Sequence, residues 1–137
     1  GHVALAGTFG YELDITKIPE EDRQQIPAQT AMYHKYNDLI RRGDYWRIAS
    51  YLENGSHHCY MVASQDKKEG LINYVQGLSR PNFHSRRVRL KGLSPENRYR
   101  IEETGEVLGG DVLMQAGMLI APLWGDYRSR LIHLTEA

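Results

Sequence analysis

The chain has 137 residues, enough for one domain with a hydrophobic core but too few for two complete domains. Its 17 basic and 17 acidic side chains balance, which argues against nucleic acid or a membrane surface as a partner, because both attract proteins with a basic excess. The single cysteine, Cys59, excludes an intramolecular disulfide framework and fits a reducing, cytoplasmic location.

The chain opens with a short apolar run at residues 3–6, followed by Gly7 and Gly10. Short apolar runs bounded by glycine are typical of strands that are buried on both faces of a parallel α/β sheet. Such a strand needs neighbours on both sides and helices above and below it, and nothing in this chain precedes it. We therefore predict a strand at residues 3–6 that belongs to the last part of a larger architecture.

A long helix is predicted at residues 19–42. Pro19 suits a first helical turn, and the acidic residues 20–22 lie where the helix dipole favours negative charge. Pro27 lies inside the pattern and should break or kink the helix. Two arginines suit the last turn, and Gly43 is expected to end the helix in the left-handed conformation. The apolar stripe on one face of this helix consists of Met32, Tyr36, Leu39 and Ile40.

From residue 44 onward, short stretches rich in β-branched and aromatic residues alternate with turns. The polar turn at residues 65–70 should join two of the strands as a hairpin. Turns about every ten residues are typical of an antiparallel sandwich. We therefore predict a strand-helix unit at residues 1–43 and a β-sandwich of about eight strands at residues 44–137. The predicted strands lie at residues 45–51, 58–64, 71–78, 86–90, 99–102, 117–121 and 129–134.

Glu12 and Asp14 follow the first predicted strand and are two residues apart, so their side chains can share one face of the chain. Paired carboxylates perform catalysis in glycosidases, and in α/β barrels the catalytic groups lie at the carboxyl ends of the strands. Two acids just before a helix, however, are more often solvated or interact with its positive end. This second interpretation is favoured, because spacing alone does not create the two different environments that a catalytic pair needs.

His57, His58 and Cys59 carry metal-binding atoms, but neighbouring strand residues point to opposite faces, and no His-x-His or Cys-x-x-Cys pair supplies further ligands. No metal site is predicted, and no cofactor is indicated.

The basic run at residues 84–91 has the charge to contact phosphate, but no aromatic residue is interleaved and an acidic segment at residues 96–106 follows. A solvated strand face is the favoured interpretation of this run.

Tyr45, Trp46 and Tyr51 are close in sequence and carry rings that can stack on a sugar. At strand spacing such residues more often pack in a core or against a neighbouring domain. The residues alone therefore indicate a strand-helix piece followed by a β-sandwich, without a defined active site.

Longer motifs carry more specific information. Near the start they are residues 1–17 (GHVALAGTFGYELDITK), residues 33–40 (YHKYNDLI) and Gly43-Asp44. Further on they are residues 90–99 (LKGLSPENRY), 103–114 (ETGEVLGGDVLM) and 125–134 (GDYRSRLIHL). The first group resembles the last barrel strand and helix of bacterial α-galactosidases of glycoside hydrolase family 36, and the second resembles their C-terminal sandwich. Pro27 departs from the pattern of that helix.

The resemblance implies the last strand-helix unit of a (β/α)8 barrel followed by a C-terminal antiparallel β-sandwich. It also implies a parent enzyme that retains anomeric configuration and removes terminal α-linked galactose from oligosaccharides such as melibiose and raffinose. The family's two catalytic aspartates lie on earlier barrel strands, so neither Glu12 nor Asp14 matches them, and this chain should be inactive alone. The residues expected in the wall of the galactose pocket are Gly7, Thr8, Phe9 and Gly10.

The expected partners are the rest of the parent barrel, an α-galactoside oligosaccharide bound by the parent enzyme, and further copies of the chain in a homo-oligomer. We expect the helix to cover the sandwich and the unpartnered strand at residues 3–6 to be disordered or paired with another copy. The alternatives are a stand-alone carbohydrate-binding sandwich and a structural interaction domain. A free binding module has no need of the strand-helix unit, which favours the enzyme's end piece.

Overall fold

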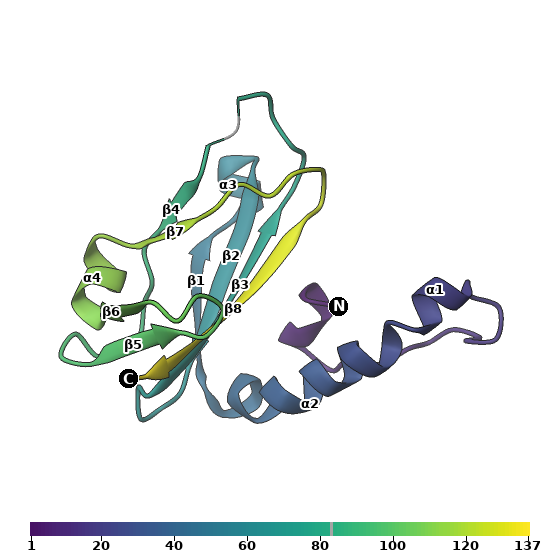
Figure 1. Ribbon diagram of the computed structural model, residues 1–137, viewed down its shortest axis with the longest axis horizontal. Helices are drawn as coiled ribbons and strands as arrows, with labels where there is room; N and C mark the ends of the chain where they lie inside the picture. Colours follow the sequence, from purple (N-terminus) through teal and green to yellow (C-terminus); the bar gives the residue numbers. More distant parts are fainter. Residues whose placement is uncertain (83) are drawn as a thin grey trace.

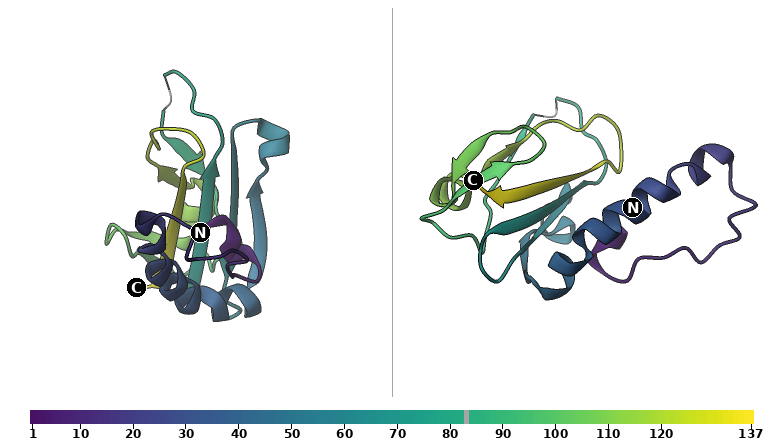
Figure 2. Two further views of the ribbon diagram at one scale, coloured as in Figure 1. Left: turned by 90° about the vertical axis from the view of Figure 1, so that its right-hand side faces the viewer. Right: turned by 60° about the horizontal axis from the view of Figure 1, so that its bottom comes forward.

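The computed structural model describes residues 1–82 and 84–137 and shows two antiparallel sheets that enclose a common core (Figure 1, Figure 2). Within these described residues, the larger sheet has six strands in the order β1-β2-β3-β8-β5-β6, and the smaller sheet pairs β4 with β7. The predicted antiparallel β-sandwich is thus confirmed. The strands are β1 (Asp44–Ala49), β2 (His57–Ala63), β3 (Glu69–Gln76), β4 (Arg86–Val88), β5 (Arg98–Ile101), β6 (Val107–Gly109), β7 (Met118–Ile120) and β8 (Ser129–Glu136). The helical elements are the 3-10 helix η1 (Val3–Ala6) and the α-helices α1 (Glu20–Arg23), α2 (Ile26–Arg42), α3 (Tyr51–Asn54) and α4 (Gly110–Gln115).

The hairpin of β2 and β3 lies at the centre of the larger sheet, with Met61 opposite Ile72. The polar turn predicted at residues 65–70 joins the two strands, and Ser64 Oγ accepts a hydrogen bond from the backbone N–H of Glu69 at 2.9 Å. The turn and the inward side chains set the register together, because a slip by one residue would point the inner side chains outward.

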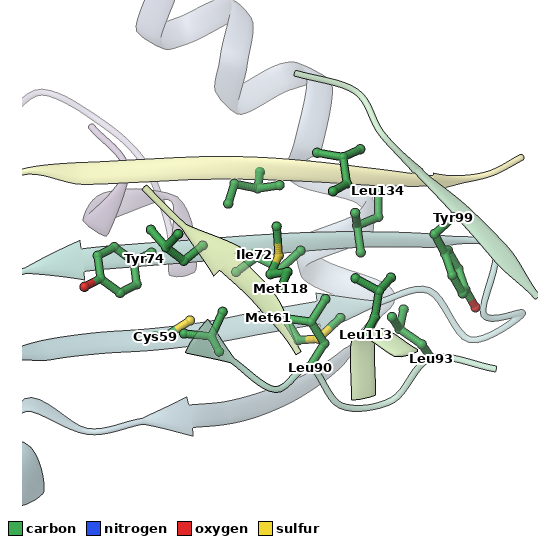
Figure 3. Close-up of a cluster of buried hydrophobic side chains, with 14 of the residues drawn as sticks. Cys59, Met61, Ile72, Tyr74, Leu90, Leu93, Tyr99, Leu113, Met118 and Leu134 are labelled. Atoms are coloured by element: carbon green, nitrogen blue, oxygen red, sulfur yellow. The ribbon is translucent and has the colours of Figure 1, made fainter. Parts of the chain in front are cut away.

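The inner face of the larger sheet packs against β4, β7 and α4 to form the hydrophobic core (Figure 3). Alternate residues of β2, β3 and β8 point into this core, because successive side chains of a strand lie on opposite faces. Burial of apolar surface is the main favourable contribution to folding in a domain of this kind. The buried cluster consists of Cys59, Met61, Ala63, Ile72, Tyr74, Val88, Leu90, Leu93, Tyr99, Ile101, Leu113, Met118, Ile120, Ile132 and Leu134.

The outer face of the same sheet is also covered, by η1 and α2 (Figure 2). Leu71 and Asn73 of β3 are 2% and 1% exposed, although they lie on the face opposite the core. Leu5 of η1 is fully buried, and Tyr36 of α2 packs edge-on against His133 of β8 with ring centroids 5.1 Å apart. The expected covering of the sandwich by the helix is therefore present, and the central strands are apolar on both sides.

The predicted strand at residues 3–6 is wrong, because this segment forms the 3-10 helix η1. Its hydrogen bonds are local, from Ala4 N–H to Gly1 O at 3.1 Å and from Gly7 N–H to Ala4 O at 3.3 Å. A strand needs the backbone groups of a neighbouring strand, whereas the outer face of the sheet offers only side chains. The segment therefore bonds to itself and is ordered, with Leu5 buried against the sheet.

The predicted long helix is present as two pieces. α1 ends at Arg23 and α2 begins at Ile26, so Pro27 lies in the first turn of α2, where a helix leaves the N–H group unpaired in any case. This break agrees with the predicted effect of Pro27. Tyr36 is the buried member of the predicted apolar stripe, and its other three residues are partly buried. Among the described residues, no helix is long and apolar enough to cross a membrane.

Gly43 follows α2, but its predicted left-handed conformation is wrong: φ is −79° and ψ is 169°, which is extended backbone. Glycine is needed here for space instead. A Cβ atom would lie 2.6 Å from Val62 Cγ1 and 2.7 Å from the carbonyl oxygens of Leu39 and Ala63. The chain passes from helix to strand in close contact with β2, which leaves no room for a side chain.

Three short elements, α3, β6 and α4, were not predicted. The strand predicted at residues 45–51 ends at Ala49, because the chain forms α3 from Tyr51 onward. Gly55 follows α3 in the left-handed conformation, with a φ of 60°. β6 is defined by its pairing with β5, where Val107 lies opposite Arg100. Elements of a few residues show too little periodicity to be identified from sequence, because a tertiary partner decides their conformation.

Replacing Gly43 by alanine is expected to lower the free energy of unfolding by about 1–3 kcal/mol, because the added methyl group meets backbone atoms on two sides. Urea denaturation followed by circular dichroism measures the change. Gly10→Ala is the matched control, since no atom lies within 4 Å of its Cβ position, and its effect should stay within about 0.5 kcal/mol. Equal stability of the two variants would contradict the close contact at Gly43.

Candidate functional site

The four residues expected in a pocket wall follow η1 and have no regular secondary structure. Gly7 and Thr8 line an open hollow of about 490 Å³ between this segment and α2. Phe9 and Gly10 are not part of its lining, so the structure brings two of the four residues together at one site. The other lining residues are Ala6, Tyr33, Asn37, Ile40 and Arg41.

The helix α2 contributes the chemically distinctive side of this hollow. Tyr33, Asn37 and Arg41 are spaced four residues apart and therefore share one face of the helix. These three residues and Thr8 line the hollow, and their side chains carry a ring, an amide, a guanidinium group and a hydroxyl. Such a combination of one aromatic ring with hydrogen-bonding groups suits a small polar ligand. The sequence interpretation missed these three residues, although their spacing in the helix was the available signal.

Aromatic contacts fix residues 9–11 on the same helix. The Phe9 ring stacks on Tyr33 with centroids 5.4 Å apart and an interplanar angle of 21°. It also meets the edge of Tyr11 at 5.5 Å and 86°. The Tyr11 hydroxyl donates a hydrogen bond to Gln29 Oε1 at 2.6 Å. Phe9 therefore acts on the hollow indirectly, by holding the segment that lines it.

A buried amide ties the N-terminal segment to the sheet. Asn73 Nδ2 donates hydrogen bonds to His2 O at 2.5 Å and to the Tyr60 hydroxyl at 3.0 Å. His2 Nδ1 also lies 2.9 Å from Ser129 Oγ. Burial lowers the pKa of His2 and favours its neutral ring. Sequence reasoning missed Asn73, although a lone amide within the apolar residues 71–75 indicates a buried polar contact.

The two carboxylates Glu12 and Asp14 are solvent-exposed. Asp14 Oδ1 accepts hydrogen bonds from the Thr16 hydroxyl at 2.6 Å and the Thr16 N–H at 3.1 Å, and Lys17 Nζ lies 3.3 Å from Oδ2. These contacts, with the Thr16 hydroxyl first, lower the pKa of Asp14. A general acid needs a raised pKa, so Asp14 is unsuited to that role. Its geometry agrees with the favoured interpretation of a surface turn before the helix.

The donors at residues 57–59 are divided between two faces of β2. The His57 ring stacks on Tyr74 at 5.3 Å, whereas the His58 ring lies 6.0 Å from that of Tyr60. Cys59 is fully buried, and burial raises the pKa of its thiol to about 12, which leaves no reactive thiolate. Within the described part of the chain, no group of three or more His, Cys, Asp or Glu residues is placed to hold a metal ion.

The aromatic residues considered for sugar stacking point in different directions. Tyr45 stacks on a tyrosine of β2, with centroids 5.1 Å apart. Trp46 belongs to the opposite face and covers Gly92, where a Cβ atom would lie 2.2 Å from Trp46 Nε1. Tyr51 begins α3 and covers Gly77 in the same way. The three rings therefore form no common platform.

The basic run at residues 84–91 contacts the backbone of neighbouring segments. The Arg87 guanidinium donates to the carbonyl oxygens of Ala116 at 3.3 Å and Gly117 at 3.2 Å. Lys91 Nζ donates to a carbonyl oxygen of β1 at 3.0 Å. The Arg87 bonds join β4 to the turn before β7 within the smaller sheet, and the Lys91 bond reaches the larger sheet. Both agree with a structural role for this run.

Replacing Asn73 by alanine should lower the free energy of unfolding by about 1–3 kcal/mol, because the His2 carbonyl and Tyr60 hydroxyl lose a buried donor. Hydrogen exchange measured by mass spectrometry should show faster exchange in residues 1–6. The matched control is Asn97→Ala, which removes an amide that donates to Glu136 at the surface. Unchanged protection of residues 1–6 in the Asn73 variant would contradict the proposed anchoring.

Comparison with known proteins gives consistent matches along the chain. The model of the glycosyl hydrolase family 36 C-terminal domain matches residues 57–134, and the melibiase model matches residues 1–43. The alpha-galactosidase AgaA of Geobacillus stearothermophilus is 40% identical over 134 residues, which are 98% of this chain and 18% of that protein.

Solved structures give the same result. The galactosidase domain of the alpha-galactosidase-sucrose kinase AgaSK superposes with a TM-score of 0.93 at 34% identity, over 99% of this chain and 19% of that one. A variant of AgaA in complex with raffinose gives 0.93 at 38% identity, with the same coverage. The chain thus spans less than a fifth of the length of these relatives. It belongs to glycosyl hydrolase family 36.

Proposed function

We propose that this chain is the end piece of an α-galactosidase, an enzyme that hydrolyses the bond to a terminal α-linked galactose. The observation that carries the proposal is the match to α-galactosidases over 98–99% of the chain, in both sequence and backbone. The substrates we propose are oligosaccharides such as melibiose and raffinose, since one matched structure holds raffinose and another holds stachyose.

The chain itself is proposed to be structural, with the retaining chemistry performed by two aspartates of the preceding barrel. A retaining glycosidase needs two carboxyl groups about 5 Å apart in different environments. Glu12 and Asp14 are exposed, and the pKa of Asp14 is lowered by local contacts. No cofactor is required for this chemistry, because a carboxylate nucleophile and a carboxylic acid suffice.

We further propose that Gly7 and Thr8 lie in the wall of the galactose pocket, with Phe9 and Gly10 behind them. The 490 Å³ hollow beside them supports this, because it combines a hydroxyl, an amide and an aromatic ring. Gly7 has no atom within 4 Å of its Cβ position, so its open side can face a ligand or the rest of the barrel.

We also propose a cytoplasmic location, in keeping with the buried free thiol of Cys59, and a homo-oligomeric parent enzyme.

The isolated chain is expected to show no turnover of an aryl α-galactoside, because it lacks the proposed catalytic pair. A continuous assay of released phenol, run with the full relative AgaA as positive control, measures this. Turnover that disappears in the Asp14→Asn variant would contradict the structural role.

A chimera tests the function of the whole protein. Replacing the matching 134-residue region of AgaA by this chain should give an enzyme that still cleaves raffinose. In this chimera, Gly7→Val should raise KM for raffinose about tenfold or more, since an added group at a pocket wall costs binding. The control Val112→Ala, on the exposed side of α4, should leave KM unchanged. A folded chimera without activity would contradict the proposed function, and an unchanged KM for Gly7→Val would contradict the pocket wall.

A further inference from the structure

The chain contains one asparagine that is followed by glycine, Asn54-Gly55, at the point where α3 ends (Figure 1). An asparagine loses its side-chain nitrogen as ammonia when the backbone nitrogen of the next residue attacks the amide carbon. Glycine at that next position gives the fastest reaction, because it has no side chain to obstruct the approach and its backbone moves freely. The other four asparagines precede larger residues: they are Asn37, Asn73, Asn82 and Asn97.

The carboxamide of Asn54 is bound at both of its polar atoms. Oδ1 accepts hydrogen bonds from the backbone N–H groups of Ser56 at 2.8 Å and His57 at 2.9 Å. Nδ2 donates a hydrogen bond to His57 O at 3.0 Å. The side chain thus joins the end of α3 to the start of β2 and gives partners to backbone groups of the turn between them. We call residues 51–57 the α3 turn.

The attacking group of this reaction, the Gly55 nitrogen, is bound as well. Its N–H donates a hydrogen bond to Tyr51 O at 2.7 Å. The Gly55 carbonyl accepts a hydrogen bond from Arg80 Nη2 at 3.0 Å. An amide nitrogen becomes nucleophilic only when it loses its proton, and a hydrogen bond to a carbonyl oxygen keeps that proton in place. Attack on Asn54 therefore requires the α3 turn to open.

The α3 turn is a part of the molecule in which local opening has a low cost. α3 has four residues, and Asn54 and Gly55 are both exposed. Short exposed elements open at free energies far below that of global unfolding. Opening releases the Gly55 nitrogen and the Asn54 carboxamide together, because their hydrogen bonds all lie within the same few residues or reach it from Arg80.

We propose that Asn54 is a modification site of this chain, where deamidation proceeds through local opening of the α3 turn and is slow while the turn is closed. In the open turn the Gly55 nitrogen forms a bond to Asn54 Cγ, the bond from Cγ to Nδ2 breaks, and Nδ2 leaves as ammonia with the proton from Gly55. Water then opens the resulting succinimide to aspartate or isoaspartate. The reaction uses only this chain and water, so it does not depend on the proposed glycosidase activity.

The products do not close the α3 turn as asparagine does. An aspartate at this position still accepts hydrogen bonds from the N–H groups of Ser56 and His57, but it has no N–H to donate to His57 O. One carboxylate oxygen would instead lie against that carbonyl group. In isoaspartate the main chain also passes through the side-chain carbons. Deamidation should therefore leave the turn open for a larger fraction of the time.

Peptide mapping by mass spectrometry tests the proposal on the 137-residue chain, incubated at mildly alkaline pH with and without denaturing guanidinium chloride. In the denaturant, Asn54 should deamidate faster than the other asparagines. In the folded chain its rate should be about tenfold or more lower, because the rate is reduced to the fraction of molecules in which the turn is open. Equal rates in the two conditions, or a faster reaction in the folded chain, would overturn the proposal.

Hydrogen exchange identifies the opening that exposes Asn54. The same opening frees the Gly55 N–H for exchange and the Gly55 nitrogen for attack. Arg80→Ala removes the donor to the Gly55 carbonyl and should accelerate both processes by a similar factor. The matched control Arg23→Ala removes an exposed arginine of α1 and should change neither. Faster exchange in Arg80→Ala without faster deamidation would contradict the proposed route.

The Asn54→Asp variant tests the effect of the product on the α3 turn. Hydrogen exchange in residues 51–57 should be about tenfold faster than in the unmodified chain, because the His57 carbonyl loses its donor. Asn97→Asp changes an amide that binds Glu136, and it should leave exchange in residues 51–57 unchanged. Unchanged exchange in the Asn54 variant would show that the amide does not close the turn.

Discussion

The arrangement of this molecule depends on a sheet whose central strands are buried on both faces. Met61 and Ile72 face a core closed by the smaller sheet and α4, while Leu71 and Asn73 lie under η1 and α2. A strand is buried on both faces only if a separate layer of structure covers each face, since its side chains alternate between the two faces. Removal of residues 1–42 would expose the outer face, including the ring of His133 that Tyr36 now covers. The N-terminal segment and helix are therefore parts of the sandwich structurally, whatever barrel they join.

This constraint explains the behaviour of the first residues. The run at residues 3–6 has the composition of a buried strand, and in this chain it is buried in part, but against side chains. No neighbouring strand is present there to accept its backbone hydrogen bonds. Its N–H groups therefore donate to carbonyl oxygens of the same segment and form a 3-10 turn. Asn73 then binds the His2 carbonyl, which gives a buried amide a partner and holds the turn in place. Position, and not composition, decides between strand and turn here.

The covering of the outer face of the sheet also determines where the hollow beside Gly7 and Thr8 lies. Gly7 and Thr8 meet Tyr33 and Asn37 where the segment leaves η1 and passes along α2, which gives the hollow a defined shape without any catalytic group. The chain thus supports one proposed surface, the hollow beside Gly7 and Thr8. The chemistry requires carboxyl groups that the described residues do not supply.

The sequence by itself determined the β-sandwich, the helix before it with its break near Pro27, the hairpin around residues 65–70 and the family, because these depend on local periodicity, turn chemistry and long motifs. It also indicated that Glu12 and Asp14 are surface groups, since acids before a helix need no tertiary partner. Only the tertiary structure decided that residues 3–6 form η1, that Gly43 is needed for space and that α2 contributes a face to the hollow. Each of these depends on groups from distant parts of the chain: an absent partner strand, the side chain of Val62, and a segment folded back onto the helix. The sequence shows which residues of α2 share a face, but it does not show which distant segment folds onto that face.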